Sequence, residues 1–278
     1  MKIKVFRIIL LSTLLFNIGF PQEDFFEFRL QKEGYYHYVD QKKIKNFSCL
    51  ISSSIYINFI KDKTDSSYYY PLKVVWTAEG SVYYIMQPFP DSLDKNLQEK
   101  VVKHVKMLKQ VFAGVLLDWQ QFSLFSPFLN IPGDAEANFG LDTVSVNYSI
   151  VKDGQAVKMK KVFGLGGKLL QVIWRSGDMK IITNPSYGEA NNKWLCYGWD
   201  NQIYNRDRVT SAMTVGLELV LLEDTWLPIR FDILAQKQAE PDQKTLFSIY
   251  FKNFIINEEF EIVSPPSESQ IQNQFLKK

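Results

Sequence analysis

Hydrophobic and polar residues alternate along the segment Phe47–Phe59. One side of an extended chain would carry Phe47, Cys49, Ile51, Ser53, Ile55, Ile57 and Phe59, and the other side Ser48, Ser52, Ser54 and Asn58. A period of two is typical of a half-buried strand. The pattern therefore predicts one long strand over Phe47–Phe59.

A different pattern follows it. Leu72–Thr77 and Val82–Met86 are rich in Val, Tyr and Ile and flank a short turn that contains Gly80, which predicts a hairpin. After Asp91 or Ser92, either of which can cap a helix, apolar residues recur every three or four positions. This stripe predicts a long amphipathic helix and comprises Leu97, Val101, Val105, Leu108, Phe112, Val115, Trp119 and Phe122.

Short strand patterns separated by turns continue almost to the end of the chain. They cover Thr143–Val151, Ala156–Phe163, Leu169–Trp174, Met179–Thr183, Met213–Leu222, Trp226–Leu234, Thr245–Phe254 and Phe260–Val263. Glu23–Lys45 is predicted to be helical, while Ser126–Leu141 and Asn184–Arg208 are predicted loops. Antiparallel hairpins with a few separate helices predict an α+β domain, a curved antiparallel sheet with one face against helices.

The amino terminus has the features of a secretory signal. Three basic residues lie within Met1–Arg7, and Ile8–Phe20 is an uncharged, mostly apolar run. This run is shorter than the roughly 20 residues of a membrane-spanning helix. We therefore expect residues 1–22 to be removed on export, with an uncleaved anchor as the alternative. Residues 23–264 are expected to form a single domain, and residues 265–278 a flexible tail.

Composition narrows the possible partners. Without Lys2, Lys4 and Arg7 the chain has 29 basic and 30 acidic residues, so it lacks the basic excess that nucleic-acid binding needs. Cys49 and Cys196 could form one disulfide in an oxidising compartment or remain two buried thiols. Two cysteines cannot form a paired CxxC metal site, and no cofactor is implied.

Catalytic patterns are weak. The chain has two histidines, His37 and His104, and no Gly-x-Ser-x-Gly motif. Residues 164–168 contain three glycines and a lysine, but their spacing fits neither a phosphate loop nor a dinucleotide motif. Adjacent carboxylates such as Glu223 and Asp224 are expected to be solvated. The sequence therefore favours a protein that is not an enzyme.

Two features point towards lipids. Lys95, Lys100, Lys103 and Lys106 lie opposite the apolar stripe of the long helix. They could contact anionic head groups or form only the solvated side of an amphipathic helix. The chain also has 21 Phe, 14 Tyr and 6 Trp. A partly closed sheet lined by aromatic side chains could enclose an apolar cavity, although an ordinary filled core has the same composition.

The carboxyl-terminal strands resemble those of a known family. Trp226–Phe231, Leu246–Asn257 and Phe260–Ile262 followed by Pro265 are similar to the closing strands of the LolA/LolB-like lipoprotein carrier superfamily, as is the order of signal peptide, helix and strand at the start. The resemblance implies an incomplete β-barrel whose concave apolar face is covered by helices and holds the acyl chains of lipoproteins. The chain lacks a lipid-attachment cysteine near its amino terminus, which favours a soluble member.

Three functional hypotheses result. The first is a periplasmic carrier that holds an acyl chain or lipoprotein in an apolar cavity and has transient contact with a membrane. Its expected lining is Ile55, Ile57, Phe59, Trp76, Leu108, Phe112, Val115, Trp174, Phe231 and Phe251. The second is an exported structural module whose aromatic loop Tyr187–Tyr204 docks another envelope protein. The third is an exported hydrolase, which would need a histidine beside a serine or cysteine.

Overall fold

The computed structural model describes residues 27–29, 38–39, 41, 43–152, 154–164 and 166–258. Several predictions concern residues outside these ranges. They are the signal peptide at 1–22, most of the helix predicted over Glu23–Lys45, His37, the strand Phe260–Val263 and the tail at 265–278.

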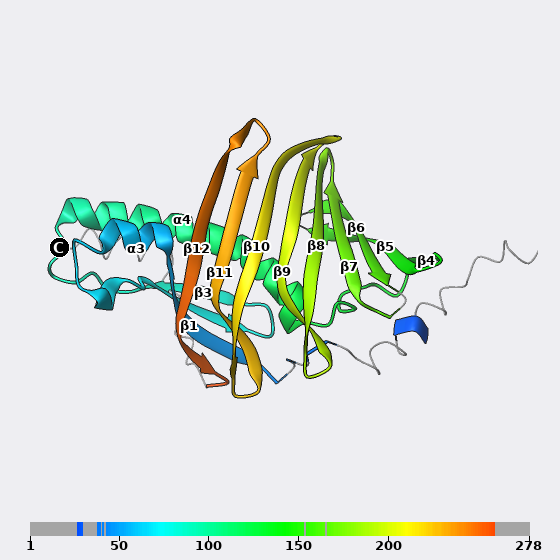
Figure 1. Cartoon of the computed structure of the whole chain (residues 1–278), viewed down its shortest axis with the longest axis horizontal. Coiled ribbons are helices and arrows are strands. Elements are labelled where there is room, and N and C mark those ends of the chain that lie inside the picture. The colour runs from blue at the N-terminus through cyan, green and yellow to red at the C-terminus, as the bar shows by residue number, and fades with distance from the viewer. Residues whose placement is uncertain are drawn as a thin grey trace, which may run out of the picture. The chain divides into compact units, whose positions relative to one another are not determined.

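Twelve strands of the described residues form one antiparallel sheet (Figure 1). Its order is β3-β2-β1-β12-β11-β10-β9-β8-β7-β6-β5-β4, so β3 and β4 are its two edges and the sheet does not close on itself. The open antiparallel sheet predicted from the sequence is thereby confirmed. The strands are β1 (Asn46–Ser53), β2 (Leu72–Thr77), β3 (Val82–Met86), β4 (Glu136–Phe139), β5 (Thr143–Lys152), β6 (Gln155–Gly164), β7 (Leu169–Ser176), β8 (Met179–Ala190), β9 (Lys193–Asn205), β10 (Arg208–Leu222), β11 (Thr225–Lys237) and β12 (Glu240–Ile256).

The long amphipathic helix is also confirmed, as α4 (Lys95–Trp119), and a π-helical turn, η3 (Gln120–Leu124), follows it. Its cap is Asp94, whose side chain accepts a hydrogen bond from the backbone N–H of Leu97, and not Asp91 or Ser92. The apolar stripe is buried from Val101 to Phe122, Leu97 is half-buried, and the four predicted lysines are exposed.

The prediction of one strand over Phe47–Phe59 is wrong in its second half. β1 ends at Ser53, and α3 (Ser54–Ile60) begins there because the Ser53 side chain accepts a hydrogen bond from the backbone N–H of Tyr56. Tyr56 and Ile60, one helical turn apart, are the buried residues of α3. Local capping therefore outweighs the period-two pattern. A short 3₁₀ turn, η2 (Ser66–Tyr68), precedes β2.

The predicted loop over Asn184–Arg208 is wrong as well. Most of it belongs to the hairpin of β8 and β9, which pair from Met179 with Asn205 to Ala190 with Lys193. Asn191 and Asn192 form the turn, and both have positive φ, as the tight hairpin turn that matches strand twist requires. Within the predicted loop Ser126–Leu141, a four-residue edge strand, β4, is present.

The chain comprises two compact units. Unit 1 contains the described residues of Met1–Val39, Ser126–Met213 and Gln236–Gln243. Its core includes a group of phenylalanine rings in which Phe128 stacks on Phe163 with ring centroids 4.8 Å apart, and Phe28 contacts both edge-on. Beside them Lys161 of β6 is buried, and its ammonium group donates hydrogen bonds to the carbonyl oxygens of Pro127 and Leu129.

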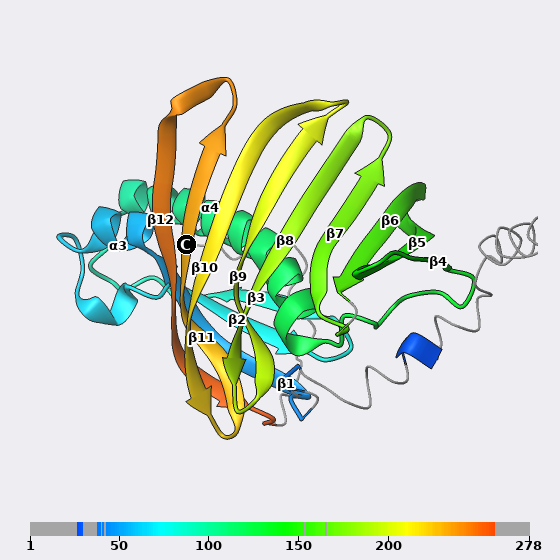
Figure 2. The ribbon, with the colours of Figure 1, turned by 45° about the vertical axis from the view of Figure 1, so that its right-hand side comes forward.

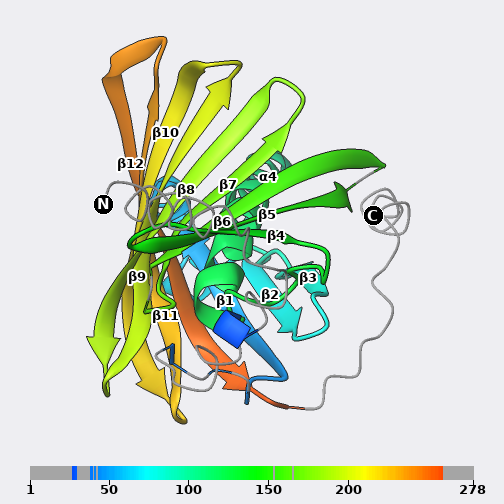
Figure 3. The same cartoon turned by 90° about the vertical axis from the view of Figure 1, so that its right-hand side faces the viewer.

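Unit 2 contains the described residues of Asp40–Phe125, Thr214–Ala235 and Lys244–Lys278. Within it α4 runs across β11 and β12 and not along them (Figures 1 and 2). β1, β2 and β3 form an antiparallel meander (Figure 3), and Gly80 has the positive φ expected in the β2–β3 turn. None of the described helices combines the length and the apolar character that crossing a membrane needs.

Candidate apolar ligand site

Part of the predicted cavity lining belongs to a group of aromatic residues in unit 2. We call it the aromatic cluster. It consists of Phe47 of β1, Trp76 of β2, Phe112 and Trp119 of α4, Phe231 of β11, and Phe251 and Phe254 of β12. The cluster brings together one helix and four strands that are far apart in the sequence.

The rings of the cluster are in mutual contact. Phe231 and Phe251 have centroids 4.8 Å apart, and Phe112 of α4 lies 6.4 Å from Phe231 and 5.7 Å from Phe251. Phe47 stacks on Trp76 at 5.2 Å and contacts Trp119 edge-on at 5.8 Å. These edge-to-face and stacked arrangements are favourable for aromatic pairs. Aromatic contacts therefore join α4 to the strands of unit 2.

Burial of the cluster follows from the sequence pattern. Phe47 lies on the face of β1 that also carries Cys49 and Ile51, and all three are buried. Ser48 and Ser52 on the other face are buried as well, so the prediction of a half-buried strand is wrong for β1. On α4, Leu108, Phe112 and Val115 share one face at helical spacing and are buried as well. Leu108 and Val115 thus extend the apolar side of α4 on either side of the Phe112 ring.

Two polar atoms are buried inside this apolar environment. The indole N–H groups of Trp76 and Trp119 have no hydrogen-bond partner in the part of the chain that the structure describes, and both side chains are almost completely buried. A buried donor without an acceptor costs about 1–3 kcal/mol. The cluster is therefore apolar with two unsatisfied donors, an arrangement that an oxygen acceptor would stabilise.

Six of the ten predicted lining residues lie in this region, namely Trp76, Leu108, Phe112, Val115, Phe231 and Phe251. The other four do not join the cluster's ring contacts. Ile55, Ile57 and Phe59 lie on α3, because the predicted strand ends at Ser53, and Ile55 is 42% exposed. Trp174 lies on β7 in unit 1, opposite Met159 and Ile181.

Sequence reasoning missed three members of the cluster. Phe47 lies in the alternating pattern and Trp119 in the helical stripe, so both patterns contained the signal. Phe254 follows Phe251 by three residues on β12, and their rings stack at 5.9 Å. An odd spacing on a regular strand points to opposite faces. Asn253, between them, has positive φ, which breaks the alternation that would have excluded Phe254.

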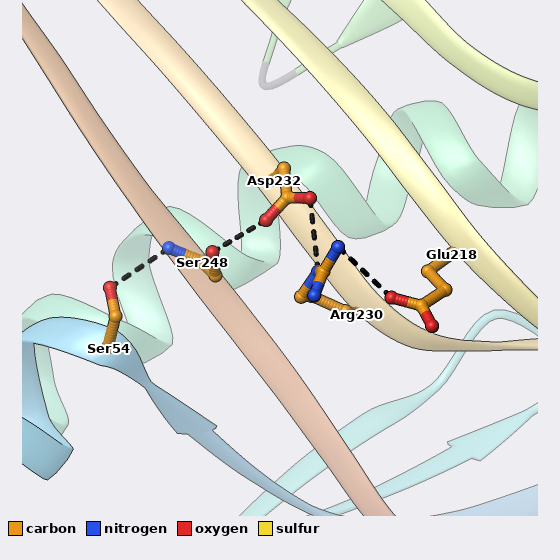
Figure 4. Close-up of polar contacts among 5 residues, drawn as sticks. All are labelled: Ser54, Glu218, Arg230, Asp232 and Ser248. Atoms are coloured by element: carbon orange, nitrogen blue, oxygen red, sulfur yellow. Dashed lines mark hydrogen bonds and ion pairs between the residues drawn. The ribbon is translucent and has the colours of Figure 1, made fainter.

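A polar chain of contacts lies elsewhere in unit 2 (Figure 4). Arg230 bonds to the carboxylates of Glu218 and Asp232, Asp232 accepts a hydrogen bond from the Ser248 hydroxyl, and the Ser248 backbone N–H donates to Ser54. These residues lie on β10, β11, β12 and the first turn of α3. Their side chains provide no histidine base for a nucleophile, and the contacts fix α3 to the sheet.

His104, on α4, has aromatic neighbours. Its ring stacks on Phe59 at 4.3 Å and contacts Tyr56 edge-on. Partial burial, and secondarily the charge of Lys63, lower the pKa of His104. Within the described residues His104 makes no hydrogen bond with a serine or cysteine, so it does not form the dyad that the hydrolase hypothesis requires. His37 lies outside the described residues.

Both cysteines are buried free thiols, Cys49 in unit 2 and Cys196 in unit 1. Of the two alternatives left open by the sequence, the structure shows the buried thiols. Burial raises the pKa of the Cys49 thiol far above its ordinary value. A protonated, buried thiol is a poor nucleophile and a poor metal ligand.

Unit 1 contains a polar pocket of about 650 Å³ on the face of β5, β6 and β7 that is opposite its core. Its lining includes Lys158, Lys160 and Arg175 together with Asp134 and Glu136. None of the ten predicted lining residues borders it. The pocket has mixed charge and does not suit an acyl chain.

Comparisons of the chain with protein-family models, with curated proteins and with solved structures found no match.

Proposed function

We propose that this protein is a carrier that binds the acyl chain of a lipid or lipoprotein at the aromatic cluster of unit 2. In this proposal the chain is exported, as its amino-terminal pattern predicts, and acts in the periplasm, as the resemblance to LolA/LolB-like carriers implies. The open sheet acts as a LolA-like half-barrel, and α4 covers its apolar, concave face.

The observation that carries the proposal is the pair of unsatisfied indole donors, Trp76 and Trp119, within an otherwise apolar cluster. Buried polar atoms without a partner among the described residues also occur elsewhere in unit 2, for example the hydroxyl groups of Ser48 and Ser52. The two indole groups differ from these because they lie among the contacting aromatic rings of the cluster. An acyl group matches both properties, because its chain contacts aromatic rings and its carbonyl or carboxylate oxygens accept hydrogen bonds.

Because the rings are in contact, an acyl chain enters the cluster only if α4 moves away from the strands. The energies permit this. Burying a chain of about 16 carbons contributes roughly 12 kcal/mol at about 0.8 kcal/mol per CH₂. Exposing one buried apolar side chain of α4 costs about 1.5–3 kcal/mol. α4 has seven buried side chains, so complete release of the helix would cost about 10–20 kcal/mol. The ligand therefore offsets a partial displacement of α4 that exposes some of these side chains.

The two ends of α4 are held differently. η3 after it buries Phe122 and Leu124, and the Ser123 carbonyl group accepts a hydrogen bond from the Gln41 side chain, whereas Asp91, Ser92 and Asp94 before it are exposed. In this proposal α4 pivots at η3, and its first turns move away from the strands, which remain paired.

The experiment is quenching of tryptophan fluorescence by a brominated stearic acid. Saturable quenching is expected, because bromine atoms in the cluster would lie beside Trp76 and Trp119. The double variant W76F/W119F should lose most of the quenching while keeping aromatic packing. The matched control W174F, altered in unit 1, should keep it. Quenching that disappears in W174F, or that never saturates, would overturn the proposal.

The docking hypothesis gains less support. Its proposed aromatic loop is the β8–β9 hairpin, in which Tyr187 and Trp199 are buried. Tyr187 and Trp194 also pack against Tyr38, at centroid distances of 5.5 and 5.3 Å. Most of these aromatic side chains therefore serve the fold of unit 1.

A further inference from the structure

The outward face of α4 is partly apolar. Besides its buried stripe, α4 exposes Met107 by 54%, Val111 by 37% and Leu117 by 59%. Met107 and Val111 are one helical turn apart, and Gly114 follows after nearly another turn. A Cβ atom added at Gly114 would have no atom within 4 Å, so this part of the helix surface is open.

The same outward face is strongly basic. α4 carries five lysines against two carboxylates, Glu99 and Asp118. Lys95, Lys100, Lys103 and Lys106 are exposed and have no hydrogen bond or ion pair within the described residues. The fifth, Lys109, lies 5.1 Å from the ring of Tyr84 on β3. The charges gather in the first two-thirds of the helix, and the exposed apolar residues extend to its end.

α3 adds to this surface. Phe59 of α3 stacks on His104 of α4, and the Lys63 ammonium lies 4.7 Å from the same Phe59 ring. Lys61 and Lys63 are exposed at the end of α3, where Asp62 is the one carboxylate between them. The stacked pair therefore places two further cations next to the lysine-rich part of α4.

We propose that the outward face of α4 docks on an anionic phospholipid bilayer. The lysines bind the head groups, while Met107, Val111 and Leu117 reach the boundary between head groups and acyl chains. Helices that lie in this interface combine basic residues with apolar ones in this way. A second copy of the chain fits this face poorly, because it would bring like-charged lysines together.

This inference rests on the proposed function and deepens it. The helix that covers the acyl site would contact the membrane from which the lipid is taken. The two faces of α4 would then have separate roles. The inner face contacts the aromatic cluster and the outer face contacts the bilayer. Their substitutions can therefore be tested separately.

The test is co-sedimentation of the full chain with vesicles of phosphatidylcholine alone and with vesicles of equal parts phosphatidylcholine and phosphatidylglycerol. Wild-type protein should bind the anionic vesicles more strongly, and added salt should weaken the binding. Each near-surface lysine contributes about fivefold at low ionic strength. The variant K100Q/K103Q/K106Q should therefore lose about 100-fold or more in affinity.

The matched control is K158Q/K193Q/K237Q, which removes three exposed lysines of unit 1 and changes the net charge equally. It should bind the anionic vesicles within a few-fold of wild type. M107S/L117S should weaken binding while keeping its salt dependence. All variants share the same amino-terminal segment, so differences among them report on the substituted positions.

Three results would overturn the inference. The first is equal affinity of the wild type for the two kinds of vesicle, and the second is an equal loss of affinity in the two lysine variants. The third is that α4 mediates self-association or captures a protein while the chain does not bind vesicles.

Bromostearate quenching in K100Q/K103Q/K106Q separates the two proposals. Quenching that persists without vesicle binding refutes membrane docking alone. Vesicle binding without saturable quenching in the wild type refutes the acyl site.

Discussion

Lys161 shows how one buried cation can organise a loop. Its ammonium nitrogen lies 2.6 Å from the carbonyl oxygen of Pro127 and 3.3 Å from that of Leu129, so β6 fixes the segment that follows η3. Desolvation by burial, and secondarily the charge of Arg29, lower the pKa of Lys161 to about 8. The cost of burying the charge is only partly offset by the two carbonyl groups.

This pKa predicts a specific pH dependence. Below pH 8 Lys161 is charged in both the folded and the unfolded chain. Between pH 8 and the ordinary value of 10.5 the unfolded chain binds more protons, so the free energy of unfolding rises with pH. We expect a rise of about 2 kcal/mol between about pH 7.5 and about pH 9.5 in urea unfolding. K161M should abolish the rise and K160M should keep it. An identical rise in K161M would contradict this explanation.

Phe112 is the residue through which α4 makes most of its described ring contacts with β11 and β12. F112A should lower the free energy of unfolding by about 3–5 kcal/mol, because it leaves a cavity among Phe231, Phe251 and Tyr84. The control on the same helix is L117A, at an exposed position. This variant should change the free energy of unfolding by less than about 0.5 kcal/mol. Denaturant unfolding measures both. Similar losses in the two variants would show that α4 is not seated on the cluster as described.

At the scale of elements, α4 was predictable and its neighbour α3 was not. The α4 stripe has an unambiguous helical period over more than six turns, so the local pattern alone predicts the helix without knowledge of its tertiary contacts. In α3 the apolar residues Ile55, Ile57 and Phe59 alternate as in a strand, and a single serine cap at Ser53 decides for the helix. Periodicity gives no information about such a cap when the helix is only seven residues long.

The start of α4 offers a matched test of capping. D94A should lower the free energy of unfolding by about 1 kcal/mol, because it removes the acceptor for the Leu97 N–H at 2.8 Å. D91A removes an equal charge three residues earlier, where the sequence also allowed a cap, and should have an effect below about 0.5 kcal/mol. Urea unfolding monitored by circular dichroism at helical wavelengths measures both. A larger effect of D91A would place the start of the helix at Asp91.

Turn chemistry explains the other misassigned element. Asn191-Asn192 supports a tight hairpin because asparagine tolerates positive φ. In the sequence the surrounding stretch is polar and contains several turn-forming residues, so its pattern predicted a loop. Glu223-Asp224 forms the turn between β10 and β11 in the same way, with positive φ at both residues. The expectation that this carboxylate pair is solvated agrees with its exposed position.

At the scale of the whole molecule, the class of sheet was predictable and the pairing of its first strand was not. Consecutive hairpins give neighbouring strands directly, as in β4 to β12. The pairing of β1 with β12 joins segments about 200 residues apart, for example Phe47 with Ile256 and Ile51 with Phe251. Without this pairing the aromatic cluster could not be assembled from sequence, although most of its members lay in recognised patterns.

The account depends most on whether unit 2 holds an acyl chain. The most direct measurement is native mass spectrometry of the protein recovered after export, followed by gentle activation and organic extraction. We expect a species heavier than the bare chain by the mass of one lipid, which is recovered in the extract and reduced in W76F/W119F but not in W174F. A spectrum of the bare chain alone, unchanged after incubation with fatty acid or phospholipid, would contradict the account.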